Sequence, residues 1–165
     1  MGEIIRGALV TRPRPAARHT RAASRLGNVL GPFDLEGPNG PGGWVILIEP
    51  ELHLGADILV PDLAGWRRTR MPELPDVAAF ELAPDWICEV VSPSTAAIDR
   101  AEKLPRYAES GVAHAWLVDP IARTLEVLRL ERGHWVLAGT HHGDARVHAE
   151  PFDAVEIELG VLWAR

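Results

Sequence analysis

The chain contains a single cysteine, Cys88, among its 165 residues. One thiol excludes an internal disulfide framework and any zinc site built from several cysteines. No run of about 18 apolar residues occurs, so nothing in the sequence predicts a membrane span. The first 26 residues also lack the basic-then-apolar layout of a secretory signal, because arginines interrupt each short apolar stretch. The sequence therefore predicts a cytoplasmic protein.

Positive charge is scarce as well, since the formal net charge is −6. This balance argues against a protein that coats nucleic acid by bulk electrostatics. The charge is unevenly distributed, because residues 1–26 hold six arginines and Trp66-Arg67-Arg68-Thr69-Arg70 forms a second basic cluster. Local basic patches suit a phosphate-bearing partner, although ordinary solvated arginines give the same pattern.

The apolar periodicity predicts an α/β chain of alternating strands and helices. Strands are expected at 3–10, 44–48, 56–62, 85–91, 114–119, 125–130, 134–138 and 155–159, and helices at 16–30 and 96–110. Gly31-Pro32 should end the first helix, residues 36–43 should form a loop, and the stretch 64–84 should be a long irregular excursion.

The order of these elements predicts how they assemble. The strand, helix and strand between residues 85 and 119 imply a right-handed parallel crossover, and the strands after residue 125 imply a C-terminal β-hairpin. We therefore expect one domain over residues 1–165, with a mixed β-sheet flanked by helices. Trp44, Trp66, Trp135 and Trp163 offer apolar surface for a homodimer.

One acidic residue, Glu89, interrupts the apolar run Trp86-Ile87-Cys88-Glu89-Val90-Val91. An ionised carboxylate in a buried strand costs several kcal/mol unless a cation, a metal or hydrogen-bond donors compensate it. Because alternate residues of a strand share a face, Cys88 should point away from Glu89 and behave as a small apolar residue. Glu89 is therefore a candidate functional group.

Asp62 is the natural partner of Glu89. It is expected to close the preceding strand, so two neighbouring strands could bring the two carboxylates together. Two carboxylates at such a short distance repel each other unless a divalent cation lies between them. Oxygen ligands favour Mg²⁺ or Mn²⁺ over zinc.

Asp99 and Lys103 are four residues apart on the helix that follows Glu89, so they share one helix face. Lys103 could reach back over the acidic pair and orient a water or stabilise charge developing on a phosphorane. The same spacing also fits a plain surface ion pair between Asp99 and Lys103, and spacing alone does not separate the two interpretations.

Nearly the whole chain resembles the Uma2 family of endonucleases, which is similar in fold to the restriction-endonuclease-like PD-(D/E)xK superfamily. The matching segments are Val60-Pro61-Asp62-Leu63, Pro84-Asp85-Trp86-Ile87-Cys88-Glu89-Val90-Val91-Ser92-Pro93-Ser94-Thr95, Asp99-Arg100-Ala101-Glu102-Lys103, Tyr107, Gly111-Val112 and Trp116-Leu117-Val118-Asp119-Pro120, together with the opening Glu3-Ile4-Ile5-Arg6-Gly7-Ala8-Leu9-Val10 and the helix near His19.

The resemblance implies that Asp62 and Glu89 bind Mg²⁺ or a similar ion. The superfamily places a lysine two residues after the second acid, where this chain has Val91, so Lys103 on the helix is the natural substitute. The chain departs from a regular helix at Pro105, which should kink it just past Lys103. Auxiliary candidates around the site are Glu49, His19, Asp99 and Tyr107.

The function that follows is metal-dependent hydrolysis of DNA phosphodiester bonds, with Arg67, Arg68 and Arg70 contacting phosphates. Two alternatives stay open. A non-catalytic interaction module would keep the nuclease scaffold while the acids only organise the structure, and Val91 at the usual lysine position favours it. A hydrolase of a small phosphorylated molecule would need an enclosed pocket instead of an open groove.

Overall fold

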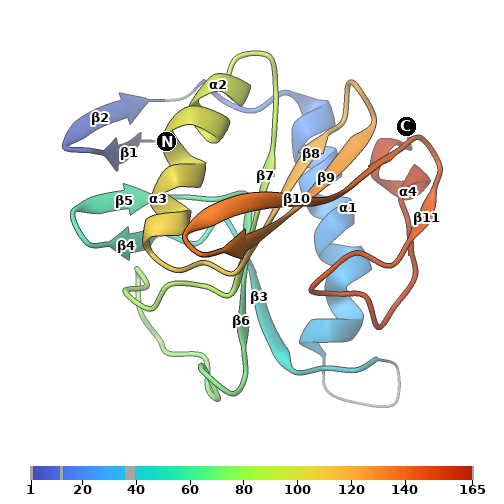
Figure 1. Cartoon of the computed structure of the whole chain (residues 1–165), viewed down its shortest axis with the longest axis horizontal. Helices are drawn as coiled ribbons and strands as arrows, with labels where there is room; N and C mark the ends of the chain where they lie inside the picture. Colours follow the sequence, from blue (N-terminus) through green and yellow to red (C-terminus); the bar gives the residue numbers. More distant parts are fainter. Residues whose placement is uncertain (1, 12, 36–39, 165) are drawn as a thin grey trace.

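A six-stranded mixed sheet runs through the centre of the computed structural model, which describes residues 2–11, 13–35 and 40–164 (Figure 1). Its strand order is β10-β9-β8-β7-β6-β3. Strands β7 and β8 are parallel and the other neighbours are antiparallel, which confirms the predicted mixed sheet. The strands are β3 (Trp44–Ile48), β6 (Leu63–Arg67), β7 (Trp86–Val90), β8 (His114–Asp119), β9 (Thr124–Glu131) and β10 (His134–His142).

Different elements cover the two faces of this sheet (Figure 1). On one face lie α1 (Ala17–Asp34), α4 (Gly160–Trp163) and a two-stranded ribbon of β11 (Arg146–Val147) and β12 (Ile157–Glu158). On the other lie α3 (Leu104–Glu109) and a second sheet ordered β2-β1-β5-β4. The bounds of that sheet are β1 (Gly2–Ile5), β2 (Ala8–Thr11), β4 (Leu52–Leu54) and β5 (Asp57–Leu59).

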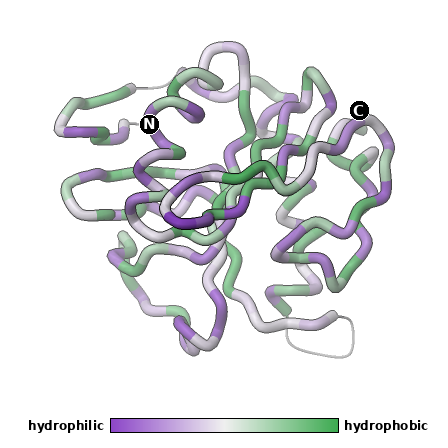
Figure 2. Tube along the Cα trace, in the orientation of Figure 1, coloured by the Kyte–Doolittle hydropathy of each residue, from purple (hydrophilic) through white to green (hydrophobic). Residues whose placement is uncertain are grey.

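The side chains of β7 alternate between two apolar cores, as the period of a strand requires. Trp86, Cys88 and Val90 pack on the α1 side, whereas Ile87 packs on the α3 side. Figure 2 shows the apolar strands of the central sheet enclosed by more hydrophilic loops. Cys88 is fully buried, and burial raises the pKa of its thiol well above the ordinary value.

Aromatic rings fill the core on the α1 side. The Phe152 ring lies 4.8 Å from Phe33 and Trp44 and 4.9 Å from Trp86, measured between centroids. Trp44 is 4% exposed and Trp66 is fully buried. The expectation that these two tryptophans offer surface for a homodimer is therefore wrong, because their rings are already used in the core.

The start of the chain differs from the expected single strand and shorter helix. Residues 3–10 form the β1–β2 hairpin, which turns at Arg6 and Gly7 with φ of 52° and 77°. Helix α1 does not stop at Gly31-Pro32 but continues to Asp34. Phe33 is 2% exposed in the aromatic core, so its burial outweighs the backbone bond that Pro32 cannot make. Of the expected loop 36–43, residues 36–39 lie outside the described residues, and 40–43 form neither helix nor strand.

The expected strand 56–62 is also broken, because β5 ends at Leu59 and β6 starts at Leu63. The region assigned to an irregular excursion thus opens with a central strand. Gly65 makes that strand possible, since a Cβ there would lie 3.2 Å from the Trp86 ring and 3.3 Å from the Trp44 ring. At the other end of the chain only Ile157–Glu158 is extended, and it pairs with β11 instead of the main sheet.

The helix predicted for residues 96–110 exists in three consecutive pieces: α2 (Ala96–Ile98), a π-helical turn η1 (Asp99–Lys103) and α3. The Leu104 N–H donates to the Asp99 carbonyl, five residues back. A proline ring clashes with the carbonyl four residues before it, so a wider turn ahead of Pro105 relieves this contact. The irregularity therefore lies over Asp99–Lys103 and not just past Lys103 as expected, because α3 already begins at Leu104.

In the part of the chain that the structure describes, no helix is both long and apolar enough to cross a bilayer.

Candidate active site

Lys103 and Glu89 meet in the interior of the protein. The Lys103 Nζ lies 2.6 Å from Glu89 Oε1 and 2.9 Å from Glu3 Oε1, and it donates to the Val60 carbonyl at 3.0 Å. The side chains of Lys103 and Glu89 are 0% and 1% exposed. Asp99 is buried as well, so the alternative of a surface Asp99–Lys103 pair does not describe this helix.

Glu3 is the member of this cluster that sequence reasoning missed. It lies on β1, and its Oε1 also accepts a hydrogen bond of 2.8 Å from the Val60 N–H. Both backbone groups of Val60 are therefore held by side chains, one by Glu3 and one by Lys103. The local signal is only an acidic residue directly before the apolar pair Ile4-Ile5, and it does not identify Lys103 as the partner.

Asp62 lies beside Glu89, although by a different route from the one expected. It does not close a strand but directly precedes β6, which runs antiparallel to β7 with Leu63 opposite Cys88. This register brings the Asp62 carboxylate to the end of β7, where its Oδ2 accepts a 2.7 Å hydrogen bond from the Val90 N–H. His19 Nε2 approaches the same oxygen at 3.3 Å.

The cluster carries an excess of negative charge. Burial, reinforced by the nearby charges of Asp99 and Asp62, raises the pKa of Glu89 from 4.5 to about 8, against the opposing effect of Lys103. Burial lowers the pKa of His19, but its hydrogen bond to Asp62 and the charges of Asp62, Asp99 and Glu89 raise it overall. The two shifts have different leading causes, because burial itself raises the pKa of Glu89, whereas neighbouring carboxylates raise the pKa of His19 against the effect of burial.

The two oxygens of Glu89 have different surroundings. Oε1 receives Lys103 and a 2.8 Å hydrogen bond from the Tyr107 hydroxyl. Oε2 is buried and has no hydrogen-bond partner among the described residues. A buried carboxylate oxygen without a partner is costly, so the arrangement suits a bound cation at Oε2.

The donor set fits Mg²⁺ or Mn²⁺ in chemical type, with Asp62 and Glu89 as the acids. Within residues 2–11, 13–35 and 40–164, no group of three or more His, Cys, Asp or Glu side chains is placed to hold a metal. Two carboxylates are nevertheless a sufficient protein contribution for Mg²⁺, which commonly keeps several waters and takes further oxygens from a substrate phosphate.

A pocket of about 740 Å³ opens over this cluster at the carboxyl end of β7. Asp62, Glu3 and His19 contribute to its wall, as do Glu49 and Val91. Glu49 is thus placed at the pocket, on an exposed position with φ of 50°. Tyr107 and Asp99 belong to the buried cluster behind it.

The three arginines expected to contact phosphate lie elsewhere. Arg67 is the last residue of β6, Arg68 and Arg70 follow it, and none of the three lines the pocket over the acids. Arg67 lies 4.6 Å from the centroid of the Trp44 ring, and Arg70 pairs with Asp85 at 2.9 Å. The arginines at the pocket are instead Arg14 and Arg18, which precede and open α1.

Fold and site together define a restriction-endonuclease-like nuclease scaffold, with a parallel strand pair and an acid cluster at its carboxyl end. The chain belongs to the Uma2 family, whose model, described as "Putative restriction endonuclease", matches residues 2–161. A crystal structure titled as a putative nuclease belonging to DUF820, from Anabaena variabilis, is similar at a TM-score of 0.79 and 22% identity, covering 98% of this chain and 89% of that one. No curated protein matches the chain.

Proposed function

We propose that this protein is a metal-dependent endonuclease that hydrolyses DNA phosphodiester bonds. One observation carries the proposal: Glu89 Oε2 is buried without a partner among the described residues, and Asp62, which accepts from the N–H of the next residue Val90, lines a pocket that arginines also line. A carboxylate left in this state is costly to the fold, and a cation binding site accounts for it.

Asp62 and Glu89 would hold Mg²⁺ or Mn²⁺. When bound, such an ion polarises the scissile phosphate and lowers the pKa of the attacking water. The chain itself fixes the two acids before any ion arrives. The Val90 N–H and His19 hold Asp62 Oδ2, while Tyr107 and Lys103 hold Glu89 Oε1. Preorganised ligands of this kind lower the cost of assembling the reactive geometry.

Lys103 acts as a positioning and charge-balancing residue in this proposal. An ammonium has three N–H donors, and those of Lys103 face Glu89, Glu3 and the Val60 carbonyl. Its side chain is 0% exposed, so no donor is left for a water or a phosphate. Lys103 lies near the acids, as expected of a lysine that replaces the one missing at position 91. Its contacts, however, favour a role in orienting Glu89 over direct contact with the substrate.

His19 contacts Asp62 and lines the pocket. The neighbouring carboxylates raise its pKa, its Nε2 faces Asp62 Oδ2, and its Nδ1 is buried. We propose that His19 holds Asp62 in the orientation that metal binding needs. Arg14 and Arg18 would hold the flanking phosphates, which makes binding fall with rising salt.

The pocket itself favours a second candidate, a hydrolase of a small phosphorylated molecule. A volume of about 740 Å³ is large enough to enclose a nucleotide-sized ligand. The same acids and arginines would serve that reaction, so substrate size is what separates the two candidates.

The test is cleavage of plasmid DNA and of single-stranded DNA with Mg²⁺ or Mn²⁺. We expect the native protein to cut in a metal-dependent way, and Glu89→Ala and Lys103→Ala to be inactive. Arg132→Gln is the control, because Arg132 lies on the exposed β9–β10 turn away from the pocket. Equal activity in all preparations would identify a contaminating nuclease and reject the proposal. Hydrolysis of nucleotides without DNA cleavage would support the second candidate.

A further inference from the structure

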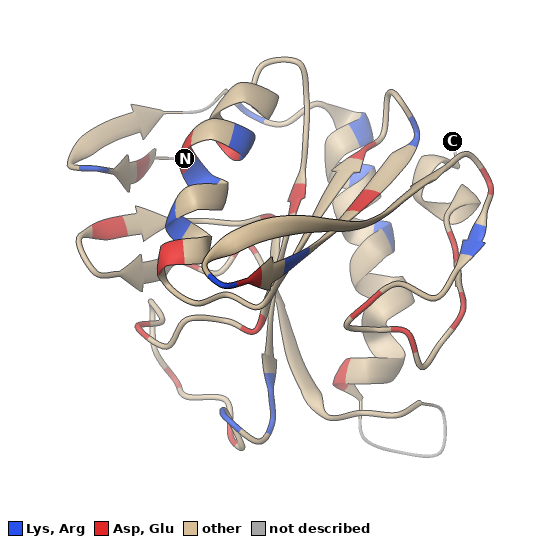
Figure 3. Ribbon diagram, viewed as in Figure 1, with Lys and Arg blue, Asp and Glu red and all other residues tan. Residues whose placement is uncertain are grey.

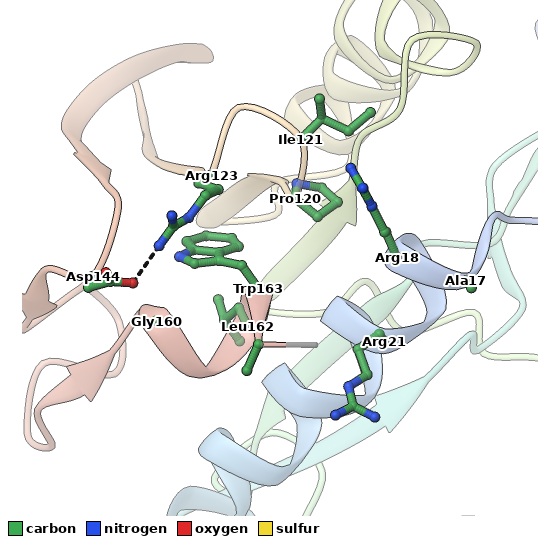
Figure 4. Close-up of a pocket in the computed structure, with 11 residues that line it drawn as sticks. Ala17, Arg18, Arg21, Pro120, Ile121, Arg123, Asp144, Gly160, Leu162 and Trp163 are labelled. Atoms are coloured by element: carbon green, nitrogen blue, oxygen red, sulfur yellow. Dashed lines mark hydrogen bonds and ion pairs between the residues drawn. The ribbon is translucent and has the colours of Figure 1, made fainter.

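A second cavity of about 580 Å³ lies next to the acid pocket (Figure 4). Arg18 and Arg21 of α1 line one side, and Arg123 and Trp163 line the other. Pro120 and Ile121, in the turn between β8 and β9, close the cavity between them. Arg123 is paired with Asp144, which also lines the cavity, so Arg18 and Arg21 are the two guanidinium groups there that face the Trp163 side without a carboxylate among the described residues.

This cavity shares part of its wall with the pocket over the acids. Arg18, Pro120 and Ile121 line both, so a ligand crossing these three residues would contact both sites. The two cavities lie at the same edge of the sheet because β7 and β8 are parallel neighbours whose carboxyl ends both reach this edge. The Val91 N–H still pairs with the Val118 carbonyl just before the chain reaches Pro120. In open α/β sheets ligands bind at the carboxyl ends of such strands.

The arginines on the α1 side differ from other arginines of the protein in their pairing. Among the described residues, no ion pair involves Arg14, Arg18 or Arg21, whereas Arg100 and Arg129 pair with glutamates at 2.7 Å. The chain holds 23 acidic and 17 basic residues, so arginines left without a carboxylate are notable. Arg18 and Arg21 are three apart in the helix and share a face. Figure 3 shows basic positions grouped along the N-terminal part of α1.

The Trp163 ring is held in place. Its Nε1 donates a 2.7 Å hydrogen bond to the Gly143 carbonyl, and the neighbouring Leu162 is buried in the core. Ile121 is 57% exposed and adds apolar surface near the ring. A fixed aromatic ring beside unpaired guanidinium groups has the composition of sites that stack a base and neutralise its phosphates.

We propose that this second cavity binds a single-stranded DNA segment that adjoins the phosphate held in the acid pocket, which rests on the nuclease function proposed above. Arg18 and Arg21 contact its phosphates, and one base stacks on Trp163. A duplex presents base edges and keeps the base faces stacked on each other, so a ring recessed in a cavity selects an unpaired base.

The experiment measures binding of a fluorescently labelled oligo-dT by anisotropy, in EDTA so that no cleavage occurs. Arg21→Gln should weaken binding several-fold and reduce the slope of log affinity against log salt by about 0.7. Trp163→Leu should weaken it by about tenfold, while Trp163→Phe, which keeps a ring, should retain most of the affinity. Arg132→Gln should bind as the native protein does, because Arg132 lies on the distant hairpin turn.

Any one of three results would overturn the inference. The first is that the native protein does not bind oligo-dT at low salt, and the second is that Arg21→Gln binds it with the native affinity. The third is that a blunt duplex binds as tightly as oligo-dT and with the same dependence on Trp163. Arg21 is exposed, so its substitution tests the site even if Trp163→Leu fails to fold. Binding is measured without metal, so the two proposals fail in different ways. If the nuclease proposal is wrong, the protein binds oligo-dT but does not cleave DNA when metal is added. If the binding proposal is wrong, the protein does not bind oligo-dT through Arg21 and Trp163.

Discussion

The acid cluster should make the stability of the metal-free protein fall as pH rises. The pKa of Glu89 is raised by burial from 4.5 to about 8. Between these two values the folded protein keeps a proton on Glu89 that the unfolded chain has released. Stability decreases with pH wherever the folded state binds more protons, so Glu89 opposes folding increasingly from about pH 5 to pH 8.

The size of this effect follows from the same two values. One proton corresponds to at most about 1.4 kcal/mol per pH unit, so the interval from 4.5 to about 8 bounds the total loss at about 5 kcal/mol. The raised pKa of His19 acts in the same direction, because its stabilising proton is also lost as pH rises. Replacing Glu89 alone separates the two contributions.

Urea denaturation of the native protein and Glu89→Gln in EDTA, at pH 5.5, 7 and 8.5, measures the effect. Glutamine resembles the protonated carboxyl, so we expect Glu89→Gln to show the shallower pH dependence and to be the more stable variant at pH 8.5. Mg²⁺ should restore stability to the native protein at that pH and leave Glu89→Gln unchanged. Parallel pH profiles for the two proteins in EDTA would refute this account of the cluster.

Three further substitutions probe the site and its support. Lys103→Met removes the one buried cation of the described residues, and we expect a loss of about 3–5 kcal/mol in urea denaturation; a loss below about 1 kcal/mol would contradict its charge-balancing role. Tyr107→Phe removes one hydrogen bond to Glu89 and should cost about 1 kcal/mol while raising the apparent pKa in the stability profile. Gly65→Ala should lower stability by about 1–3 kcal/mol, because the new methyl group meets the Trp86 and Trp44 rings; unchanged thermal unfolding would show that these rings yield easily.

The sequence predicted the central crossover well because its signals are local. The run from Trp86 to Val91 is apolar throughout except for Glu89, and the helix and strand that follow have clear boundaries. The alternation of the strand also placed Cys88 and Glu89 on opposite faces. The approach of Lys103 to Glu89 was predicted from chain order and a family resemblance, and the structure brings the two within 2.6 Å.

The parts that were missed depend on contacts between distant residues. Helix α1 passes Pro32 because Phe33 is needed in an aromatic core that the C-terminal region completes through Phe152. The sequence did not predict strand β6 because Gly65 has low strand propensity. The neighbouring tryptophan rings explain why a glycine stands at this position of the strand. Glu3 reaches Lys103 across 100 positions of sequence, a separation at which no periodicity or spacing rule applies.

The basic residues show the same limit. Arg67, Arg68 and Arg70 are adjacent in sequence and were expected to act together, yet Arg70 is paired with Asp85 and none of the three reaches the acid pocket. Sequence clustering therefore did not predict which arginines lack an acidic partner, because the pairing depends on the fold.

Asp62 and Glu89 together should bind a divalent cation, and Mn²⁺ titration followed by electron paramagnetic resonance tests this binding directly. At pH 8 the native protein should bind Mn²⁺ specifically, with Mg²⁺ competing and with affinity that falls as Glu89 is protonated at lower pH. Asp62→Asn and Glu89→Gln should each abolish this binding, whereas Arg132→Gln should not change it. Equal Mn²⁺ binding by all four proteins, or none by the native protein, would contradict the account.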